Sequence, residues 1–350
     1  LLMLPVRRLA QAGMLMAAGV ALTALYAGGA GRLAAAARTP YAADAPVVRI
    51  VQANIDQKDK WKPENLEAVF DAYLDLTGRP AATPPDIVIW PEGALPAVID
   101  DLLAPGSPFA PRLRDAVRPG QTLLMGANRV DADPNGRAGG GDGWLYYNTL
   151  LAFRRDGPAL RVIGVYDKHH LVPFGEFMPL GDLADRLGVR ALVRMPDDFS
   201  AGPPPRPLEL PGLPTVQPLI CYEALFPRLA DGAERPAWIL NISNDAWFGA
   251  TSGPWQHLNI ASYRAIEAGL PMVRSTPTGV SAVIDPQGRI LSRRMLGLGR
   301  AGIIDARLPS PGPPTLYSRI GEVPFAAMLL LSAAAWLAGR RRRPRSPETG

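Results

Sequence analysis

The central part of the chain alternates between short apolar runs and polar turns, and this pattern predicts strands and helices in succession. Residues 47–55 alternate in polarity and are rich in β-branched side chains, which indicates a strand. Residues 63–78 carry apolar side chains at near-helical spacing between a proline and a glycine, which predicts a helix. Residues 86–90 form an apolar run that ends in a Pro-Glu pair, as expected of a buried strand.

Further along the chain, strand patterns outnumber helical ones. We expect a short helix before residue 117, a longer helix over about residues 255–268, and an irregular proline-rich loop over residues 196–218. Strands are expected at residues 122–130, 147–154, 162–167, 215–221, 238–244, 272–276, 280–285 and 301–307. Strands that first alternate with helices and then pair as hairpins predict an α/β domain of two packed sheets with helices outside.

Each end of the chain holds an apolar run without charge, at residues 9–31 and 323–339. Because about 17–25 helical residues cross a bilayer core, both runs predict transmembrane helices. Arginines precede the first run and follow the second, so the positive-inside rule places both termini in the cytoplasm. The body between them then faces outward, into the periplasm of a Gram-negative cell. A cleaved signal peptide is the alternative interpretation of the first run.

The net charge of +5 belongs to the ends of the chain rather than to the body. Nine of the 37 basic residues and one of the 32 acidic residues lie before residue 39 or after residue 338. The body is therefore slightly acidic, which argues against nucleic acid as a partner. A single cysteine excludes an internal disulfide, and one cysteine with three histidines offers no zinc-ligand spacing.

The single cysteine, Cys221, stands at the end of an apolar strand. A buried structural thiol is one interpretation. An isolated cysteine at a strand end in an oxidising compartment also suits a nucleophile. A papain-like pair with His257 would supply a base, but this histidine lies in a predicted helix among apolar residues and is expected to be structural.

Two charged residues stand at strand ends in the same way as the cysteine. Glu92 follows the run D-I-V-I-W-P, and Lys168 follows R-V-I-G-V-Y-D. Each alone is typical of a solvated strand end. Together, the carboxylate, ammonium and thiol of Glu92, Lys168 and Cys221 supply a base, an oxyanion stabiliser and a nucleophile for acyl transfer.

These three residues stand in motifs that resemble a known family. The segments I-W-P-E-G-A-L-P, Y-D-K-H-H-L-V-P-F-G-E-F-M-P, L-I-C-Y-E and N-I-S-N-D-A-W-F-G-A-T-S-G-P-W-Q-H are similar to those of the apolipoprotein N-acyltransferases, in the nitrilase (carbon-nitrogen hydrolase) superfamily. The resemblance covers about residues 45–310. It implies an α/β fold, a four-layer α-β-β-α nitrilase-like sandwich with flanking transmembrane helices.

The resemblance also implies domains and residue roles. Residues 1–44 would be a membrane span and linker, either the end of a longer membrane region or a reduced membrane part. Residues 45–312 would be the periplasmic catalytic domain, and residues 313–350 the second span and a basic cytoplasmic tail. The implied catalytic residues are Glu92 as general base, Lys168 as oxyanion residue and Cys221 as nucleophile. The implied supporting residues are Glu176, Tyr222 and Glu223 in the active site and Trp247 on a mobile arm.

The implied reaction moves an acyl chain from a phospholipid, typically phosphatidylethanolamine, through a thioester on Cys221. The acceptor is the amino group of a diacylglyceryl-modified N-terminal cysteine on an apolipoprotein, at the inner membrane, and no metal or organic cofactor is implied. The apolar loop at residues 94–104 and parts of the proline-rich stretch are expected to form lids that touch lipid, with ordinary surface loops as the alternative. Alternatives are a membrane-anchored amidase of the same superfamily and a non-catalytic, membrane-tethered binding protein.

Overall fold

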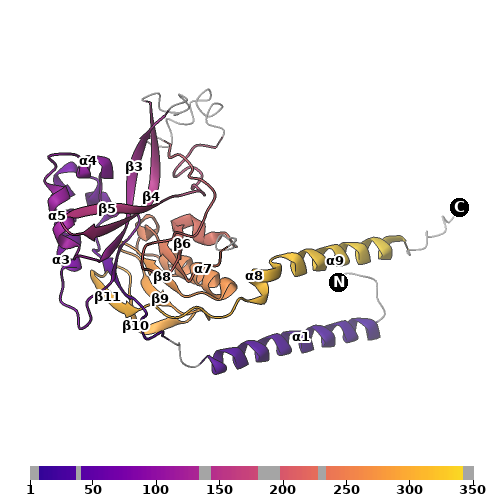
Figure 1. The fold of residues 1–350 in the computed structure, drawn as a ribbon. Coiled ribbons are helices and arrows are strands. Elements are labelled where there is room, and N and C mark those ends of the chain that lie inside the picture. The colour runs from indigo at the N-terminus through magenta and orange to yellow at the C-terminus, as the bar shows by residue number, and fades with distance from the viewer. Residues whose placement is uncertain (1–7, 37–40, 134–142, 180–197, 228–233, 342–350) are drawn as a thin grey trace. The chain divides into compact units, whose positions relative to one another are not determined.

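The protein is described by a computed structural model that covers residues 8–36, 41–133, 143–179, 198–227 and 234–341. The chain divides into two units, Pro40–Pro314 and a second unit made of Leu1–Thr39 with Thr315–Gly350. Each unit is described by itself, beginning with the larger (Figure 1).

The larger unit contains two β-sheets. Six strands form one sheet in the order β11-β1-β2-β3-β4-β5, and five strands form the other in the order β10-β9-β8-β7-β6. The first sheet comprises β1 (Val47–Gln52), β2 (Ile87–Trp90), β3 (Thr122–Ala132), β4 (Trp144–Asp156), β5 (Ala159–Asp167) and β11 (Gly302–Arg307). The second comprises β6 (Val216–Ile220), β7 (Trp238–Ile242), β8 (Met272–Ser275), β9 (Ser281–Ile284) and β10 (Ile290–Leu296).

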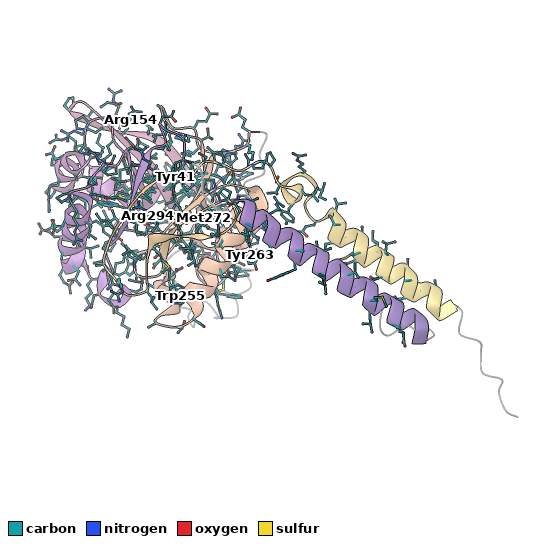
Figure 2. The ribbon with its side chains drawn as sticks, turned by 90° about the horizontal axis from the view of Figure 1, so that it is seen from below. Tyr41, Arg154, Trp255, Tyr263, Met272 and Arg294 are labelled. Carbon is teal, nitrogen blue, oxygen red and sulfur yellow. The ribbon has the colours of Figure 1, made fainter. Side chains whose placement is uncertain are left out.

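Helices accompany both sheets. Those that precede or follow strands of the first sheet are α2 (Gln57–Lys60), η1 (Pro63–Asn65), α3 (Leu66–Thr77), α4 (Ile99–Leu103) and α5 (Phe109–Ala116). Those of the second sheet are two short 3₁₀ helices, η3 (Cys221–Leu225) and η4 (Asp245–Phe248), and the longer α7 (Gly253–Ala268). Helix α7 carries Trp255 and Tyr263 on its exposed side (Figure 2).

Side chains that alternate along the central strands enter different layers of the core. Ile89 of β2 shares one buried cluster with Leu240 of β7, so the two sheets pack face to face. Trp90, on the opposite face of β2, packs in a second cluster with α3. Ile239, next to Leu240, packs in a third cluster with Leu258 of α7. The layers are therefore helix, sheet, sheet and helix, which confirms the predicted nitrilase-like α/β core and explains why its strands are apolar on both faces.

The direction of the strands brings several loops together at one edge of each sheet. Strands β1, β2 and β3 are parallel, as are β6, β7 and β8. Strand β5 runs in the same direction as β3, since both are antiparallel to β4. The residues that follow β2, β5, β6 and β7 consequently lie at the carboxyl ends of their sheets. In open α/β sheets this is where functional side chains gather.

Three expectations about local structure were wrong. Strand β10 was not anticipated. The predicted irregular loop does not extend to residue 218, because Pro218 lies within β6, paired with Leu240; an edge strand tolerates a proline because one side of it has no partner strand. Segment 94–104, predicted to be a loop, contains the short helix α4, and its Leu102 is buried in the same cluster as residues of α3.

The second unit contains the helices of the two chain ends: α1 (Arg8–Ala35), α8 (Leu316–Ile320) and α9 (Val323–Arg341). Within α1, the segment Gln11–Ala35 is 25 residues long and contains a stretch of 18 residues with a mean hydropathy of 1.5, so it is long and apolar enough to cross a membrane. Among the helices that the structure describes, this is the one such segment; the apolar part of α9, Val323–Gly339, is shorter. The end of the predicted cytoplasmic tail, residues 342–350, lies outside the described residues.

Candidate functional site

Three of the predicted site residues form a buried cluster of charges. Glu92 follows β2, Lys168 follows β5, and Glu176 lies in the loop after it. The Lys168 Nζ atom lies 2.8 Å from Glu176 Oε1 and 3.4 Å from Glu92 Oε1. The Lys168 side chain is 1% exposed, so these contacts are shielded from water. One ammonium therefore bridges two carboxylates that come from separate loops.

The Glu92 carboxylate is further fixed by two asparagines. Asn148 of β4 donates from Nδ2 to Glu92 Oε1 over 2.7 Å and to Glu176 Oε1 over 2.9 Å. The backbone N–H of Asn244, which follows β7, donates to Glu92 Oε2 over 2.5 Å. Hydrogen bonds to an ionised carboxylate are among the stronger polar contacts in proteins. Both oxygens of Glu92 thus have donors that hold the side chain in one orientation.

Cys221 sits at the turn between β6 and η3 in a backbone conformation that is rare for a residue with a side chain. Its φ angle is +48°, in the left-handed region. Such conformations persist where the surrounding structure fixes them, and they are frequent at functional sites. The conformation places the thiol at the carboxyl end of β6, the same type of position that Glu92 and Lys168 occupy at their strands.

The ionisation of Cys221 depends on the charges around it. Burial and the negative charge of Glu92 raise the pKa of the Cys221 thiol to about 12, while Lys168 and a hydrogen bond from Ser243 act in the opposite direction. Burial alone would lower the pKa of Lys168, but the charges of Glu92, Cys221 and Glu176 raise it above the ordinary value. The raised pKa favours the neutral form of the Cys221 thiol at neutral pH. Reaction requires removal of the thiol proton by a base.

The other predicted site residues differ in environment. Glu223 is fully buried and accepts hydrogen bonds from the backbone N–H groups of His169 and Ile220, each over 2.8 Å, and from the Tyr166 hydroxyl. Burial raises the pKa of Glu223 in spite of these donors. This carboxyl group therefore connects the turn that carries Cys221 to the loop after β5.

Tyr222 and Trp247 lie nearer the surface. Tyr222 packs edge-on against Phe226, with ring centroids 5.1 Å apart. Trp247, in η4, is 75% exposed, unusual for a tryptophan. An exposed aromatic side chain on a short helix that follows β7 is available for contact with another molecule.

A second buried polar cluster adjoins Cys221 from the side of α7. Arg274 of β8 donates from Nη2 to both oxygens of Asp245, over 2.8 and 2.9 Å, and His257 Nδ1 lies 2.9 Å from Asp245 Oδ1. Burial opposes ionisation of this carboxyl, yet Arg274 and His257 hold the pKa of Asp245 at about 2. The structure therefore places His257 in a side-chain network, in keeping with the structural role expected for it.

Sequence reasoning missed four polar residues of the site. Asn148 and Asn244 were indistinguishable from ordinary polar positions in or after strands, and Asp245 from a helix cap. Lys60 in α2 lies in the polar segment Q-K-D-K but is only 2% exposed, and its Nζ donates to the carbonyl oxygen of Gly93. All four can be recognised only from their positions near the other site residues in the folded chain. Among the described residues, no group of three or more metal-ligating side chains comes together.

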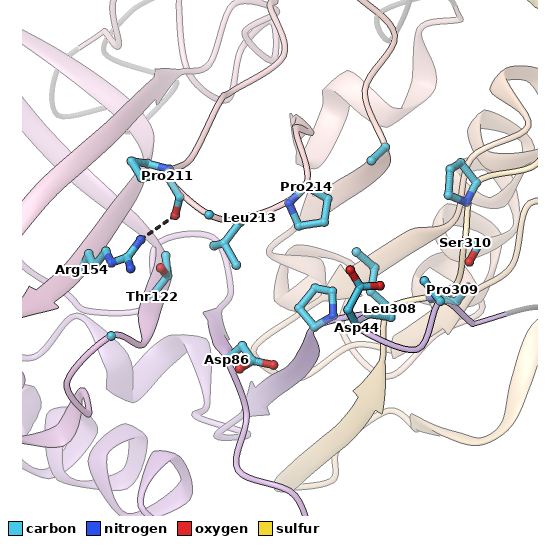
Figure 3. Close-up of a pocket in the computed structure, with 17 residues that line it drawn as sticks. Asp44, Asp86, Thr122, Arg154, Pro211, Leu213, Pro214, Leu308, Pro309 and Ser310 are labelled. Atoms are coloured by element: carbon cyan, nitrogen blue, oxygen red, sulfur yellow. Dashed lines mark hydrogen bonds between the residues drawn. The ribbon is translucent and has the colours of Figure 1, made fainter.

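A pocket of about 540 Å³ lies at the opposite ends of the strands, away from these clusters. It is lined by Asp86 and Thr122, just before or at the start of β2 and β3, and by Pro214, before β6 (Figure 3). Arg154 closes one side through a hydrogen bond to the Pro211 carbonyl. None of the predicted site residues lines this pocket, so its size does not bear on the chemistry of Cys221.

Comparison with known proteins gives matches over most of the chain. Residues 47–311 match the family model for carbon-nitrogen hydrolase. The chain is 50% identical over 286 residues to a Caulobacter vibrioides protein named apolipoprotein N-acyltransferase, a match covering 81% of this chain and 53% of that protein. It is 43% identical over 309 residues to a protein of the same name from Bradyrhizobium diazoefficiens, covering 84% and 53%. The chain thus spans about half the length of these curated relatives.

Solved structures give the same fold at lower sequence identity. An amidase from Nesterenkonia sp. superposes with a TM-score of 0.50 at 19% identity, covering 83% of this chain and 98% of that one. At this identity the likeness concerns the fold alone.

Proposed function

Because the chain belongs to the carbon-nitrogen hydrolase family, we propose that it carries the catalytic part of an apolipoprotein N-acyltransferase. The single observation that carries the proposal is the buried arrangement of Glu92, Lys168 and Glu176 at the strand ends near Cys221. The names of the relatives support the choice of reaction. The donor is a membrane phospholipid such as phosphatidylethanolamine, and the acceptor is a diacylglyceryl-modified apolipoprotein.

In the first half of the reaction, Glu92 accepts the proton of the Cys221 thiol, and the thiolate attacks the ester carbonyl of the phospholipid. Lys168 and backbone N–H groups stabilise the oxyanion of the tetrahedral intermediate. The ester C–O bond breaks, the proton passes from Glu92 to the departing oxygen, and lysophospholipid leaves. The acyl chain remains as a thioester on Cys221.

In the second half, the α-amino group of the apolipoprotein cysteine attacks the thioester. Glu92 accepts a proton from the amine, the C–S bond breaks, and the proton returns to Cys221. The pKa of the Cys221 thiol is raised to about 12, so the thiol needs a base in each cycle, and Glu92 takes this role. Glu176, Tyr222 and Glu223 support the site, and Trp247 contacts substrate.

We further propose that the body faces the periplasm and that both chain ends cross the inner membrane. Both substrates are anchored in a bilayer, so an enzyme acting on them needs to stay at its surface. The apolar segment Gln11–Ala35 supports this placement, and the arginine-rich chain ends support the orientation.

The test uses the purified full chain in mixed micelles with phosphatidylethanolamine and a synthetic diacylglyceryl-cysteinyl peptide. We expect the peptide to gain one acyl chain and, without peptide, Cys221 to carry a thioester, both seen by mass spectrometry. Cys221→Ala should abolish both products. Release of free fatty acid without acylation of the peptide would overturn the proposal in favour of a hydrolase, and unchanged acylation by the alanine variant would overturn the mechanism.

A further inference from the structure

The nucleophile's own peptide group is held by the buried cluster on the side of α7. His257 Nε2 lies 3.3 Å from the backbone carbonyl oxygen of Cys221. A carbonyl oxygen can only accept, so the ring nitrogen donates in this contact. His257 is 6% exposed, and its partner Asp245 is fully buried. The imidazole ring that makes this contact is therefore almost inaccessible to water.

The histidine ring cannot turn freely, because a chain of polar contacts fixes it. Arg274, which is fully buried, binds Asp245 with Nη2 and Asn241 with Nη1. Asp245 in turn lies 2.9 Å from His257 Nδ1. The chain runs from β7 and β8 through η4 to α7, so it connects the nucleophile to the rigid second sheet.

The direction of the Cys221 carbonyl determines the direction of the next N–H group. The peptide bonds of the described chain are trans, so the C=O of Cys221 and the N–H of Tyr222 point to opposite sides of their shared plane. This N–H belongs to the first turn of η3, where backbone donors have no partner within the helix. Among the residues that the structure describes, no oxygen accepts a hydrogen bond from it.

We infer that His257 is a positioning residue that fixes the Cys221–Tyr222 peptide so that the Tyr222 N–H points away from α7, toward the acyl oxygen of the intermediate on Cys221. Loss of this contact leaves the thiol in place but removes one of the two constraints on the peptide plane, the other being the i→i+3 bonding of η3. Oxyanion donors act only when they are already aimed at the developing charge. The inference deepens the proposed function and rests on Cys221 as the acyl carrier, though not on the identity of the donor.

The test compares two reactions of Cys221 in the purified full chain. Acylation by p-nitrophenyl butyrate passes through an oxyanion and is followed by p-nitrophenol release and intact mass. Alkylation by iodoacetamide passes through no oxyanion. For His257→Ala we expect acylation to slow by about 100-fold and alkylation to stay within about threefold of the wild type. His257→Gln, whose amide can still donate, should recover part of the acylation rate.

The control variant is Asn259→Ala, which alters an exposed side chain on the same helix and should change neither rate. Melting temperatures of all variants establish that they are folded. Equal slowing of both reactions in His257→Ala and His257→Gln would show a merely structural role and overturn the inference, as would acylation at the wild-type rate. Because the ester is not a phospholipid, these outcomes are distinct from failure of phospholipid-to-peptide transfer, which would contradict only the proposed function.

Discussion

Lys60 illustrates how the site holds charge away from water. Its side chain is almost fully buried, and its ammonium group donates to the Gly93 carbonyl, next to Glu92. Burial lowers the pKa of Lys60 from 10.5 to about 8, although the charge of Glu92 acts in the opposite direction. Between pH 8 and 10.5 the unfolded chain binds more protons at this residue than the folded chain, so this group makes stability rise with pH across that window. Below pH 8 the buried ammonium is charged and lowers the free energy of unfolding by a constant amount.

Lys60→Met should therefore stabilise the protein at pH 7. The lowered pKa corresponds to about 3 kcal/mol, and loss of the hydrogen bond offsets about 1 kcal/mol of this gain. We expect the melting temperature at pH 7 to rise by about 4–8 °C and the difference from the wild type to shrink as the pH approaches 10. Lys62→Met, at an exposed lysine two residues away, should show neither effect. A Lys60→Met protein that melts below the wild type at both pH values would contradict the prediction.

The sequence allowed some residues of the site to be anticipated and not others. Glu92, Lys168 and Cys221 each follow a strongly apolar strand. A charged or reactive side chain at such a position is unusual, which made these three residues candidates. Asn148 and Lys60 offer no such contrast, because a polar residue within or beside a polar segment is ordinarily solvated. Their importance appears only when β4 and α2 are seen to approach Glu92.

At the scale of elements, the close approach of β3 to the loop after β2 depends on Gly126. A Cβ atom there would lie 2.6 Å from the backbone Cα of Glu92 and still closer to the carbonyl oxygen of Pro91. The carbonyl of Gly126 also accepts a hydrogen bond from the Ala94 N–H over 2.9 Å. The strand and the loop can adopt this spacing only without a side chain at this position.

Gly126→Ala should displace the Glu92 backbone and with it the carboxylate that we propose as the general base. We expect acylation of Cys221 to fall by about 100-fold, since displacements of about 1 Å have effects of that size, and stability to fall by about 1–3 kcal/mol. The acylation rate and the melting temperature measure the two effects. Gly297→Ala is the matched control, because a Cβ atom there meets nothing within 4 Å. Wild-type acylation by Gly126→Ala would show that Glu92 does not depend on this contact.

Most strands and helices could be predicted from the pattern of apolar residues, because the central strands are packed against other elements on both faces. Strand β2 is apolar throughout and β7 carries one polar residue, Asn241, so both segments were recognisable as buried strands. Strand β10 was missed because it lies at the edge of its sheet and carries the charged pair of Arg293 and Arg294. Segment 94–104 was predicted to be a loop because an apolar loop and a short buried helix have similar compositions; Ile99 and Leu102 of α4 instead pack in the same buried cluster as residues of α3.

At the scale of the whole molecule, the distribution of charge predicts how the chain lies across a membrane. The basic excess belongs to the chain ends, and the body is slightly acidic. Arginines resist transfer across the membrane, so they should stay in the cytoplasm while the body is exported. Since Cys221 is the single cysteine, replacing it with serine gives a background in which new cysteines report on this arrangement.

We expect Asp44→Cys, in the exposed segment before β1, to react with a membrane-impermeant maleimide in intact Gram-negative spheroplasts. Ser346→Cys, behind the C-terminal arginines, should react only after the membrane is permeabilised. Labelling of both variants in intact spheroplasts would place the C-terminus outside and contradict the second membrane span. A mature chain shortened by about the length of α1, with the Asp44→Cys variant still labelled, would instead identify the first apolar run as a cleaved signal peptide. The expected labelling with an unshortened chain thus indicates a body held by both chain ends, whereas a shortened chain indicates a body held by its C-terminal helix alone.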